Sequence, residues 1–183
     1  MAQFLCFCFM EATSKNIWTI GHSTRTLEEF MAILRSFNIE MVVDVRHFPG
    51  SKKYPHFNKE ELGVSLKSGN INYQHVIDLG GRRKANKESQ NTAWRHPAFR
   101  AYADYMETQQ FENGVNLLKR IAETDRTAYM CSEAVWWRCH RAMISDSMKA
   151  DGWSVMHIMG LYKAEEHPYT SPAKITDGKL HYR

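Results

Sequence analysis

Short apolar runs alternate with longer amphipathic stretches along most of the chain. The apolar runs are rich in β-branched and aromatic side chains, which is typical of buried strands. They predict strands at residues 17–20, 41–45, 71–76, 127–130 and 153–158. Apolar residues at helical spacing predict helices at residues 27–37, 59–68, 99–106, 111–121 and 140–148. This order predicts an α/β protein with three layers, α/β/α, around a mostly parallel sheet of Rossmann-like or flavodoxin-like type.

The length and composition fit one compact domain. A chain of 183 residues with 43% hydrophobic residues can bury a core without added cross-links. We expect this single domain to span residues 17–183, preceded by a disordered extension at residues 1–16. Residues 4–10 are apolar, but they lack a basic flank and are far fewer than the roughly 20 that span a bilayer, so we expect no membrane attachment. An Asp177-Gly178 pair predicts a hairpin turn.

The four cysteines occur as two close pairs, Cys6 with Cys8 and Cys131 with Cys139. No secretory signal is recognisable, so we expect reduced thiols and a cytoplasmic location rather than a disulfide framework. No second pair of Cys or His residues stands at the spacing of a zinc ribbon, and no cofactor fingerprint is visible. We therefore expect neither a metal nor a cofactor.

Reactive residues follow several of the predicted strands. In an open parallel sheet the carboxyl ends of the strands share one edge, where ligands bind. The residues at these ends are His22 and Ser23, Asp44 and Arg46, Arg82 and Arg83, Cys131 and Glu133, and His157. Polar residues also end strands for structural reasons, because turns prefer them. Arginine, histidine and cysteine are not ordinary turn formers, so the sequence favours one crevice built from several segments.

The densest reactive chemistry lies at residues 130–141, which lead from a predicted strand into a predicted helix. Cys131 is a candidate nucleophile, because the following helix start and nearby arginines would depress its pKa. A buried cysteine that acts as a small apolar side chain is the structural alternative. At the start of the helix, His140 is expected to move a proton and Arg141 to bind an anion, with Cys139 as a further substrate contact.

A net charge of +4 is compatible with a phosphate-bearing ligand or nucleic acid but does not require one. Arg46, Arg82 and Arg83 are candidates for holding anionic oxygens, because a guanidinium group can bind a phosphate through two hydrogen bonds. Asp44 ends a buried strand, so its charge must find a partner such as Arg46 or Arg141. A structural ion pair and a catalytic carboxylate are both consistent with that position.

Eight ordered motifs run through the chain. They are residues 19–24 (TIGHST), 43–46 (VDVR), 48–49 (FP), 57–59 (FNK), 79–83 (LGGRR), 99–104 (FRAYAD), 130–133 (MCSE) and 139–141 (CHR). In this set the chain resembles the domain of unknown function 488 family, from about residue 17 to the carboxyl terminus. The resemblance implies a shared active site that includes the last two motifs, and it implies little about the reaction. The residues between those two motifs vary in the family, so Trp136, Trp137 and Arg138 are not expected to carry the shared chemistry.

Two functions are consistent with these residues. The first is a small enzyme with hydrolase-type chemistry that acts on a phosphorylated, nucleotide or nucleic acid substrate in the crevice. Its expected catalytic residues are His22, Asp44, Cys131, Glu133 and His140. Its expected substrate-binding residues are Ser23, Arg46, Arg82, Arg83, Cys139 and Arg141. The alternative is a nucleic-acid-binding module without catalysis, in which basic loops contact phosphates and Trp94, Trp136 or Trp137 stacks on bases.

Overall fold

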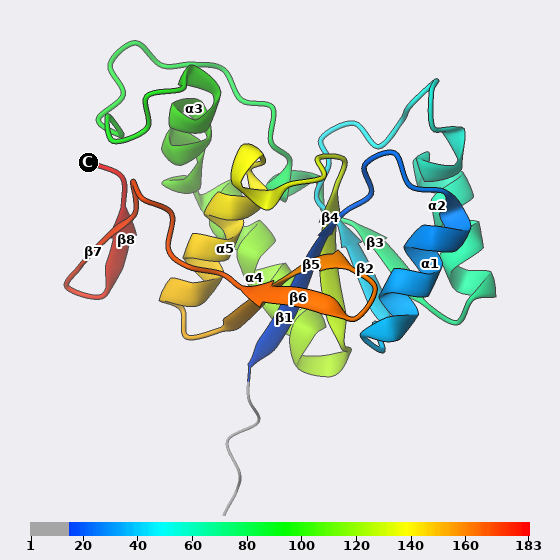
Figure 1. Cartoon of the computed structure of the whole chain (residues 1–183). Coiled ribbons are helices and arrows are strands. Elements are labelled where there is room, and N and C mark those ends of the chain that lie inside the picture. Colours follow the sequence, from blue (N-terminus) through cyan, green and yellow to red (C-terminus); the bar gives the residue numbers. More distant parts are fainter. Residues whose placement is uncertain (1–14) are drawn as a thin grey trace, which may run out of the picture.

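A six-stranded, mostly parallel sheet forms the centre of the protein in the computed structural model, which describes residues 15–183 (Figure 1). The strands are β1 (Asn16–Gly21), β2 (Met41–Asp44), β3 (Asn72–His75), β4 (Thr127–Cys131), β5 (Ser154–Gly160) and β6 (Lys163–Glu166). They lie in the order β3-β2-β4-β1-β5-β6. The first five strands in this order are parallel, and β6 pairs antiparallel with β5.

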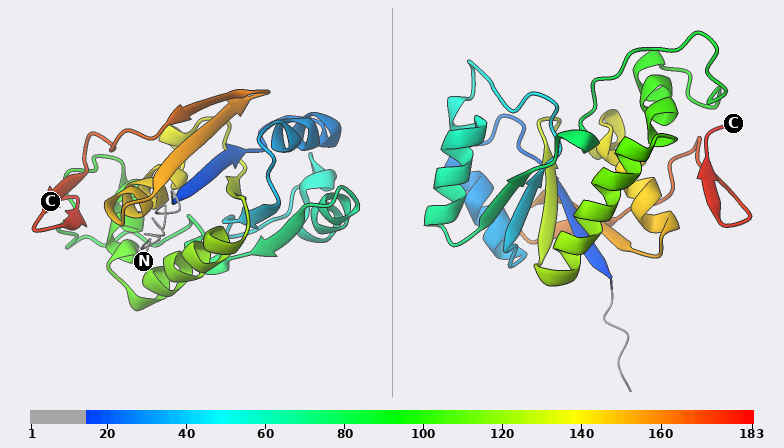
Figure 2. Two further views of the ribbon diagram at one scale, coloured as in Figure 1. Left: turned by 90° about the horizontal axis from the view of Figure 1, so that it is seen from below. Right: turned by 180° about the vertical axis from the view of Figure 1, so that it is seen from behind.

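Within residues 15–183, five α-helices cover the two faces of the sheet (Figure 2). They are α1 (Leu27–Ser36), α2 (Lys59–Ser68), α3 (Pro97–Met106), α4 (Gln109–Thr124) and α5 (Arg141–Ala150). The buried residues of α1 and α2 form one core layer with Val42 and Met130, whereas those of α3, α4 and α5 form the other with Val43 and Tyr129. Neighbouring residues of one strand thus face opposite layers. The predicted three-layer α/β/α class with a mostly parallel sheet is confirmed.

The central strands are buried on both faces. All five residues of β4 are buried, as are the five residues of β1 that follow Asn16. Strands of a covered parallel sheet therefore read as continuous apolar runs rather than as alternating ones. After β1 the chain turns into α1 at a capping box, because Thr26 Oγ1 accepts the Glu29 N–H and Glu29 Oε2 accepts the Thr26 N–H. The turn before this cap is held to the end of β4, because the backbone N–H groups of His22 and Ser23 donate to the carbonyl oxygens of Cys131 and Ser132.

Helix α2 has the predicted bounds, and the boundaries of the other four helices differ from the predicted ones by at most three residues. Helices α3 and α4 each begin two residues earlier than expected, since Pro97 stands in the first turn of α3 and the Thr108 side chain caps α4. Helix α5 begins one residue later, with His140 at its N-cap position. The edge strand β6 was not predicted. Its sequence, KAEE, is polar because one side of an edge strand faces solvent.

The two ends of the chain complete the description. The extension expected at residues 1–16 lies outside the described residues apart from its last two, and Asn16 already belongs to β1. Near the carboxyl end, β7 (Lys174–Thr176) and β8 (Lys179–His181) form a hairpin. Its turn residues Asp177 and Gly178 both have positive φ, as the pair predicted. No helix within residues 15–183 combines the length and the apolar character needed to cross a membrane.

Candidate functional site

A cavity of about 940 Å³ lies at the edge of the sheet where the parallel strands end. The segments that follow β1, β2 and β4, the loop after the short 3-10 helix η2 (Ile77–Leu79), and the start of α5 all contribute to its wall. Of the residues expected at the site, the wall includes His22, Ser23, Arg46, Arg82, Cys131, Glu133, Cys139 and His140. The other three, Asp44, Arg83 and Arg141, do not line it. The cavity thus brings together residues from segments far apart in the sequence.

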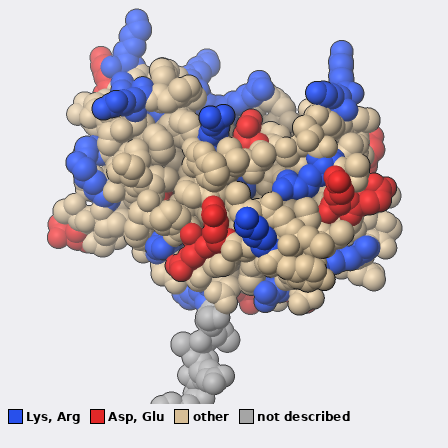
Figure 3. Space-filling view, viewed as in Figure 1, with Lys and Arg blue, Asp and Glu red and all other residues tan. Residues whose placement is uncertain are grey.

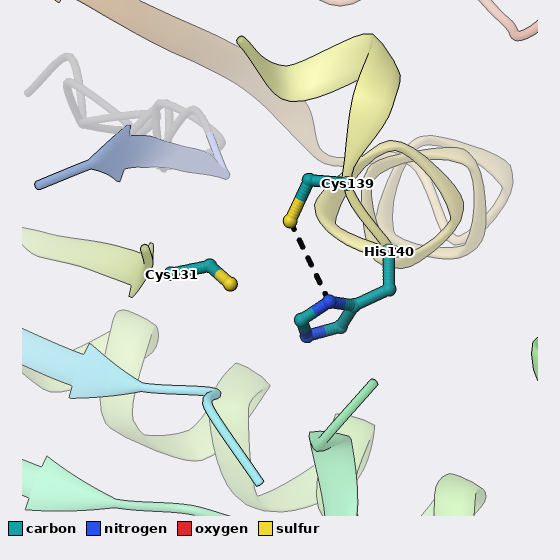
Figure 4. A group of neighbouring side chains, drawn as sticks. All are labelled: Cys131, Cys139 and His140. Carbon is teal, nitrogen blue, oxygen red and sulfur yellow. Dashed lines mark hydrogen bonds between the residues drawn. The ribbon is translucent and has the colours of Figure 1, made fainter. Parts of the chain in front are cut away.

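Cys131, Cys139 and His140 form a compact cluster in this wall (Figure 4). Cys131 is the last residue of β4, and the other two residues immediately precede α5. The two sulfur atoms and a ring nitrogen of His140 all lie within 4.8 Å of one another. Cys139 Sγ and His140 Nδ1 are 3.5 Å apart. The segment between Cys131 and Cys139, which contains the short 3-10 helix η3 (Trp136–Arg138), returns the chain to the end of β4.

The backbone fixes which His140 nitrogen carries hydrogen. His140 Nε2 lies 3.0 Å from the carbonyl oxygen of Val45. A carbonyl can only accept, so Nε2 donates, and Nδ1 of the neutral ring presents a lone pair toward Cys139. Gly81 lets the ring take this position, because a Cβ at residue 81 would lie 2.5 Å from His140 Nδ1. The second glycine of the LGGRR motif is thereby explained by a close approach to the cluster.

The two thiols differ in acidity. Burial raises the pKa of Cys139, but a hydrogen bond from Cys131 and the charge of Arg141 outweigh it and lower the pKa from 9.0 to about 6. A side-chain hydrogen bond to Cys139, together with burial, raises the pKa of Cys131 to about 12. The expectation of a depressed pKa at Cys131 was therefore wrong. The helix start and the arginine that favour a thiolate stand beside Cys139 instead.

Arg141 supports the cluster from the interior rather than facing the cavity. Its side chain is 1% exposed. Nη1 donates to Thr19 Oγ1 at 2.9 Å, and Nη2 donates to the Glu133 carbonyl oxygen at 2.6 Å. A Cβ at Gly21 would overlap that carbonyl. Arg141 therefore ties the loop after β4 to β1, and the anion-binding role expected for it stays a prediction that this position does not favour.

Asp44 and Arg46 form a buried ion pair at the cavity wall, which Arg46 lines and Asp44 does not. Arg46 Nη2 lies 2.6 Å from Asp44 Oδ2, and the Tyr73 hydroxyl donates to the same oxygen at 2.8 Å. Arg46 Nη2 also donates to the Phe57 carbonyl oxygen, and Nη1 approaches His22 Nε2 at 3.3 Å. Because a guanidinium group only donates, His22 Nε2 is an acceptor and His22 Nδ1 donates to a backbone oxygen. Burial and the charge of Arg46 lower the pKa of His22 to about 4, which keeps the ring neutral.

Three other side chains named from the sequence do not line the cavity and contact other residues. The Arg83 guanidinium stacks on Tyr105 at 3.3 Å and donates to the Gly80 carbonyl oxygen. Trp94 stacks on Phe99. His157 is 1% exposed and does not line the cavity, although it was expected near the crevice. It belongs to a separate buried network in α5, β5 and the segment after β6.

Exposed aromatic and basic side chains stand around the cavity. Phe48 is 66% exposed and Trp137 is 50% exposed, and both line the cavity. The Arg82 guanidinium lies 5.7 Å from the centre of the Phe48 ring, and Arg138 is exposed beside Trp137. Figure 3 shows Lys and Arg side chains along the upper edge of the molecule, the edge toward which the parallel strands point in Figure 1. Phe48 and Arg138 line the cavity but were not among the site residues expected from the sequence, where Phe48 stood only in the FP motif and Arg138 was set aside because its segment varies in the family.

The comparisons with known proteins identify the family. The sequence model for the domain of unknown function DUF488 matches residues 26–148, which is more than half of the chain. The chain belongs to the DUF488 family. The matched range includes Cys131, Glu133, Cys139 and His140, so the cluster lies within the DUF488 domain. A comparison with curated proteins and one with solved structures each found no match.

Proposed function

We propose that this DUF488 protein is an enzyme with hydrolase-type chemistry that acts on a nucleotide or nucleic acid substrate in the cavity at the carboxyl ends of the strands. One observation carries the proposal: Cys131, Cys139 and His140 converge within 4.8 Å of one another in the wall of a cavity of about 940 Å³. A convergence of reactive groups in a large concave site is the ordinary arrangement of a catalytic centre.

The exposed side chains around the cavity favour a substrate that combines an aromatic group with phosphate. Exposed Phe48 and Trp137 offer faces on which a base can stack, and such stacking contributes about 1–3 kcal/mol per base. Arg82 and Arg138 are exposed at the cavity and are not held in ion pairs within the described residues. Their guanidinium groups suit phosphate oxygens. A nucleotide carries both features.

Glu133 supports a proton transfer beside the cluster. It lies two residues after Cys131, lines the cavity, and its side chain is exposed while its carbonyl is held by Arg141. A carboxylate in this position can take a proton from water as the bond to the leaving group breaks. The cluster supplies the reactive centre, and Glu133 acts as the general base.

The test is turnover by the full chain and by matched variants. Purified protein is incubated with nucleotides, single-stranded DNA and single-stranded RNA, and products are separated by chromatography. Cys139→Ser and His140→Asn are each expected to lower the hydrolysis rate by about 100-fold or more, and Glu133→Gln by about 10²- to 10⁴-fold. Glu60→Gln, an exposed carboxylate on α2, is the control and should leave the rate unchanged. The absence of turnover on all three substrate classes would contradict the proposal.

A nucleic-acid-binding module without catalysis is the second candidate. The exposed rim formed by Phe48, Arg82, Trp137 and Arg138 is the observation that favours it. This function requires affinity for single-stranded nucleic acid that survives Cys139→Ser. Tight binding without any product formation would favour the module over the enzyme.

A further inference from the structure

The structure assigns a metal site to the same cluster: we propose that Cys131, Cys139 and His140 bind one divalent cation of the Zn²⁺ class and leave its fourth position open to the cavity. This inference deepens the proposed function and rests on it for the role of the metal. The sequence led us to expect no metal, because the ligands do not come in two closely spaced pairs. Strand β4 and the segment before α5 bring them together instead.

The distances fit a tetrahedral ion. Bonds of about 2.3 Å to sulfur and 2.0–2.1 Å to nitrogen, at a tetrahedral angle, place the two ligand atoms about 3.5 Å apart. Cys139 Sγ and His140 Nδ1 are 3.5 Å apart. Two sulfurs on one zinc ion lie about 3.8 Å apart by the same geometry. Since all three ligand atoms lie within 4.8 Å of one another, a shift of at most about 1.3 Å brings Cys131 into place.

The His140 ring already has the orientation of a metal ligand. His140 donates Nε2–H to the Val45 carbonyl oxygen, so the Nδ1 lone pair faces the sulfur atoms. Metal-binding histidines characteristically donate their other ring N–H to a carbonyl or carboxylate, which fixes the tautomer and the ring orientation. Gly81 provides the space for the ring at this position. The outer contacts of a metal ligand are thus present around His140.

The chemistry of the donors selects the class of cation. Two thiols and one imidazole bind borderline-soft ions such as Zn²⁺, whereas Mg²⁺ and Ca²⁺ prefer oxygen ligands. Within the described residues, no carboxylate, histidine or further cysteine joins the three ligands. Three protein ligands with one open position are characteristic of catalytic zinc, whereas structural zinc takes four. All three ligands line the cavity, so the open position faces the substrate.

This arrangement gives the proposed hydrolysis a defined course. The three ligands would hold the ion, the ion would lower the pKa of a water in its open position, and Glu133 would take the proton from that water as its oxygen attacks the phosphorus atom of the substrate. A bond forms between phosphorus and the water oxygen, the bond to the leaving oxygen breaks, and the proton on Glu133 passes to that oxygen. No oxidant or reductant is required.

The experiment measures metal content and coordination rather than activity alone. The full chain is purified under reducing conditions, freed of metal with a chelator, and titrated with Zn²⁺ and with Co²⁺. We expect one equivalent of either ion to bind, and the Co²⁺ form to show thiolate charge-transfer and tetrahedral visible bands. The double variant Cys6→Ser/Cys8→Ser excludes the other cysteine pair and should bind the same equivalent.

Matched variants locate the ligands. Cys131→Ser, Cys139→Ser and His140→Ala are each expected to weaken Zn²⁺ binding by more than the roughly 10- to 100-fold that follows loss of an outer contact. His96→Asn is the control, because His96 lines the same cavity and an asparagine can still cap α3. Circular dichroism and thermal unfolding of each variant establish that it is folded. Unchanged Zn²⁺ binding in a folded ligand variant, or no stoichiometric binding by the parent chain, overturns the metal site.

The two proposals fail in different ways. Hydrolysis that persists after chelation but is lost in Cys139→Ser would support the enzyme and overturn the metal site, with the free thiolate as nucleophile. One tightly bound ion that depends on all three ligands, without hydrolysis of any nucleotide or nucleic acid, would support the metal site and contradict the proposed function.

Discussion

Gly81 and Asp44 show how single positions set the environment of the cavity. Gly81 allows the His140 ring to approach the backbone more closely than any side chain would permit. Asp44 has no exposed surface and holds Arg46, which in turn contacts His22 and the Phe57 carbonyl oxygen. Neither Gly81 nor Asp44 need touch a substrate to affect the site. Each acts through the position of a neighbouring group.

Gly81→Ala is expected to weaken Zn²⁺ binding by about 10- to 100-fold, the usual effect of disturbing the surroundings of a metal ligand. The added methyl group would lie 2.5 Å from His140 Nδ1 and must displace the ring. Competition with a chromogenic chelator measures the affinity. Gly160→Ala is the control, since a methyl group there meets no atom within 4 Å. Equal affinities in the two variants would show that Gly81 does not position His140.

Asp44→Asn is expected to lower the free energy of unfolding by about 3–5 kcal/mol, because the buried Arg46 charge loses its carboxylate partner. Denaturant titration measures the change. Asp151→Asn removes a more exposed pair with Lys119 and should cost no more than about 1 kcal/mol. A similar small loss in both variants would mean that solvent or another group compensates the charge of Arg46.

At the scale of elements, a buried hydrogen-bonded chain joins α5, β5 and the segment after β6. His157 Nε2 lies 2.8 Å from His167 Nδ1, and His167 Nε2 lies 3.0 Å from Asp146 Oδ1. Because the carboxylate only accepts, the His167 ring donates to it and accepts from His157. Trp136 of η3 stacks on the His157 ring at 4.3 Å and donates to Glu165. These contacts of Trp136 therefore anchor the segment between Cys131 and Cys139 to β5 and β6.

This network makes stability depend on pH. Burial is the largest cause that lowers the pKa of His157 from 6.5 to about 2, with the neighbouring His167 imidazole and the charge of Arg141 as smaller causes. Below about pH 6.5, His157 therefore takes up a proton in the unfolded state but stays neutral in the folded state. The contribution of His157 to the free energy of unfolding is complete above about pH 6.5 and is lost as the pH falls. The slope is at most about 1.4 kcal/mol per pH unit. Urea unfolding at pH 7 and pH 5 measures the loss.

His157→Gln is the matched variant for this measurement, since an amide can still donate to His167 but does not titrate. The variant should lose less stability than the parent chain between pH 7 and pH 5. His22, whose pKa is lowered to about 4, adds a loss of the same sign to both proteins and cancels in the difference. Equal losses in the parent and the variant would show that His157 does not carry the effect.

The helices and strands could largely be predicted from the sequence, whereas the environment of the side chains at the cavity could be predicted only in part. Strands such as β2 and β4 could be predicted because a buried parallel strand leaves a continuous apolar run. The chain gives no such local signal for the acidity of Cys139 rather than Cys131, which depends on the folded position of Arg141. The partner of His157 was also hidden, because His167 follows an edge strand too polar to be recognised.

At the scale of the whole molecule, the fold of a chain with a modest net charge places two exposed arginines at one cavity. The chain carries a formal charge of +4, and the exposed Arg82 and Arg138 lie at the cavity with Phe48 and Trp137. Cations that line a cleft raise the local concentration of an anionic ligand. Stacking on the aromatic side chains also contributes to affinity, and salt weakens this contribution far less than it weakens the electrostatic attraction. The two contributions can therefore be separated by ionic strength.

Single-stranded nucleic acid is expected to bind with an affinity that falls as salt is added. Each phosphate contact on a single strand contributes about 0.7 to the slope of log K against log salt concentration. Arg82→Gln/Arg138→Gln should therefore reduce that slope by about 1.4 in fluorescence anisotropy titrations with a labelled oligonucleotide. Lys59→Gln/Lys67→Gln removes the same charge from exposed positions on α2 and should leave the slope nearly unchanged. Equal slopes for the two double variants would show that long-range attraction by the net charge, rather than contact at the cavity rim, accounts for binding.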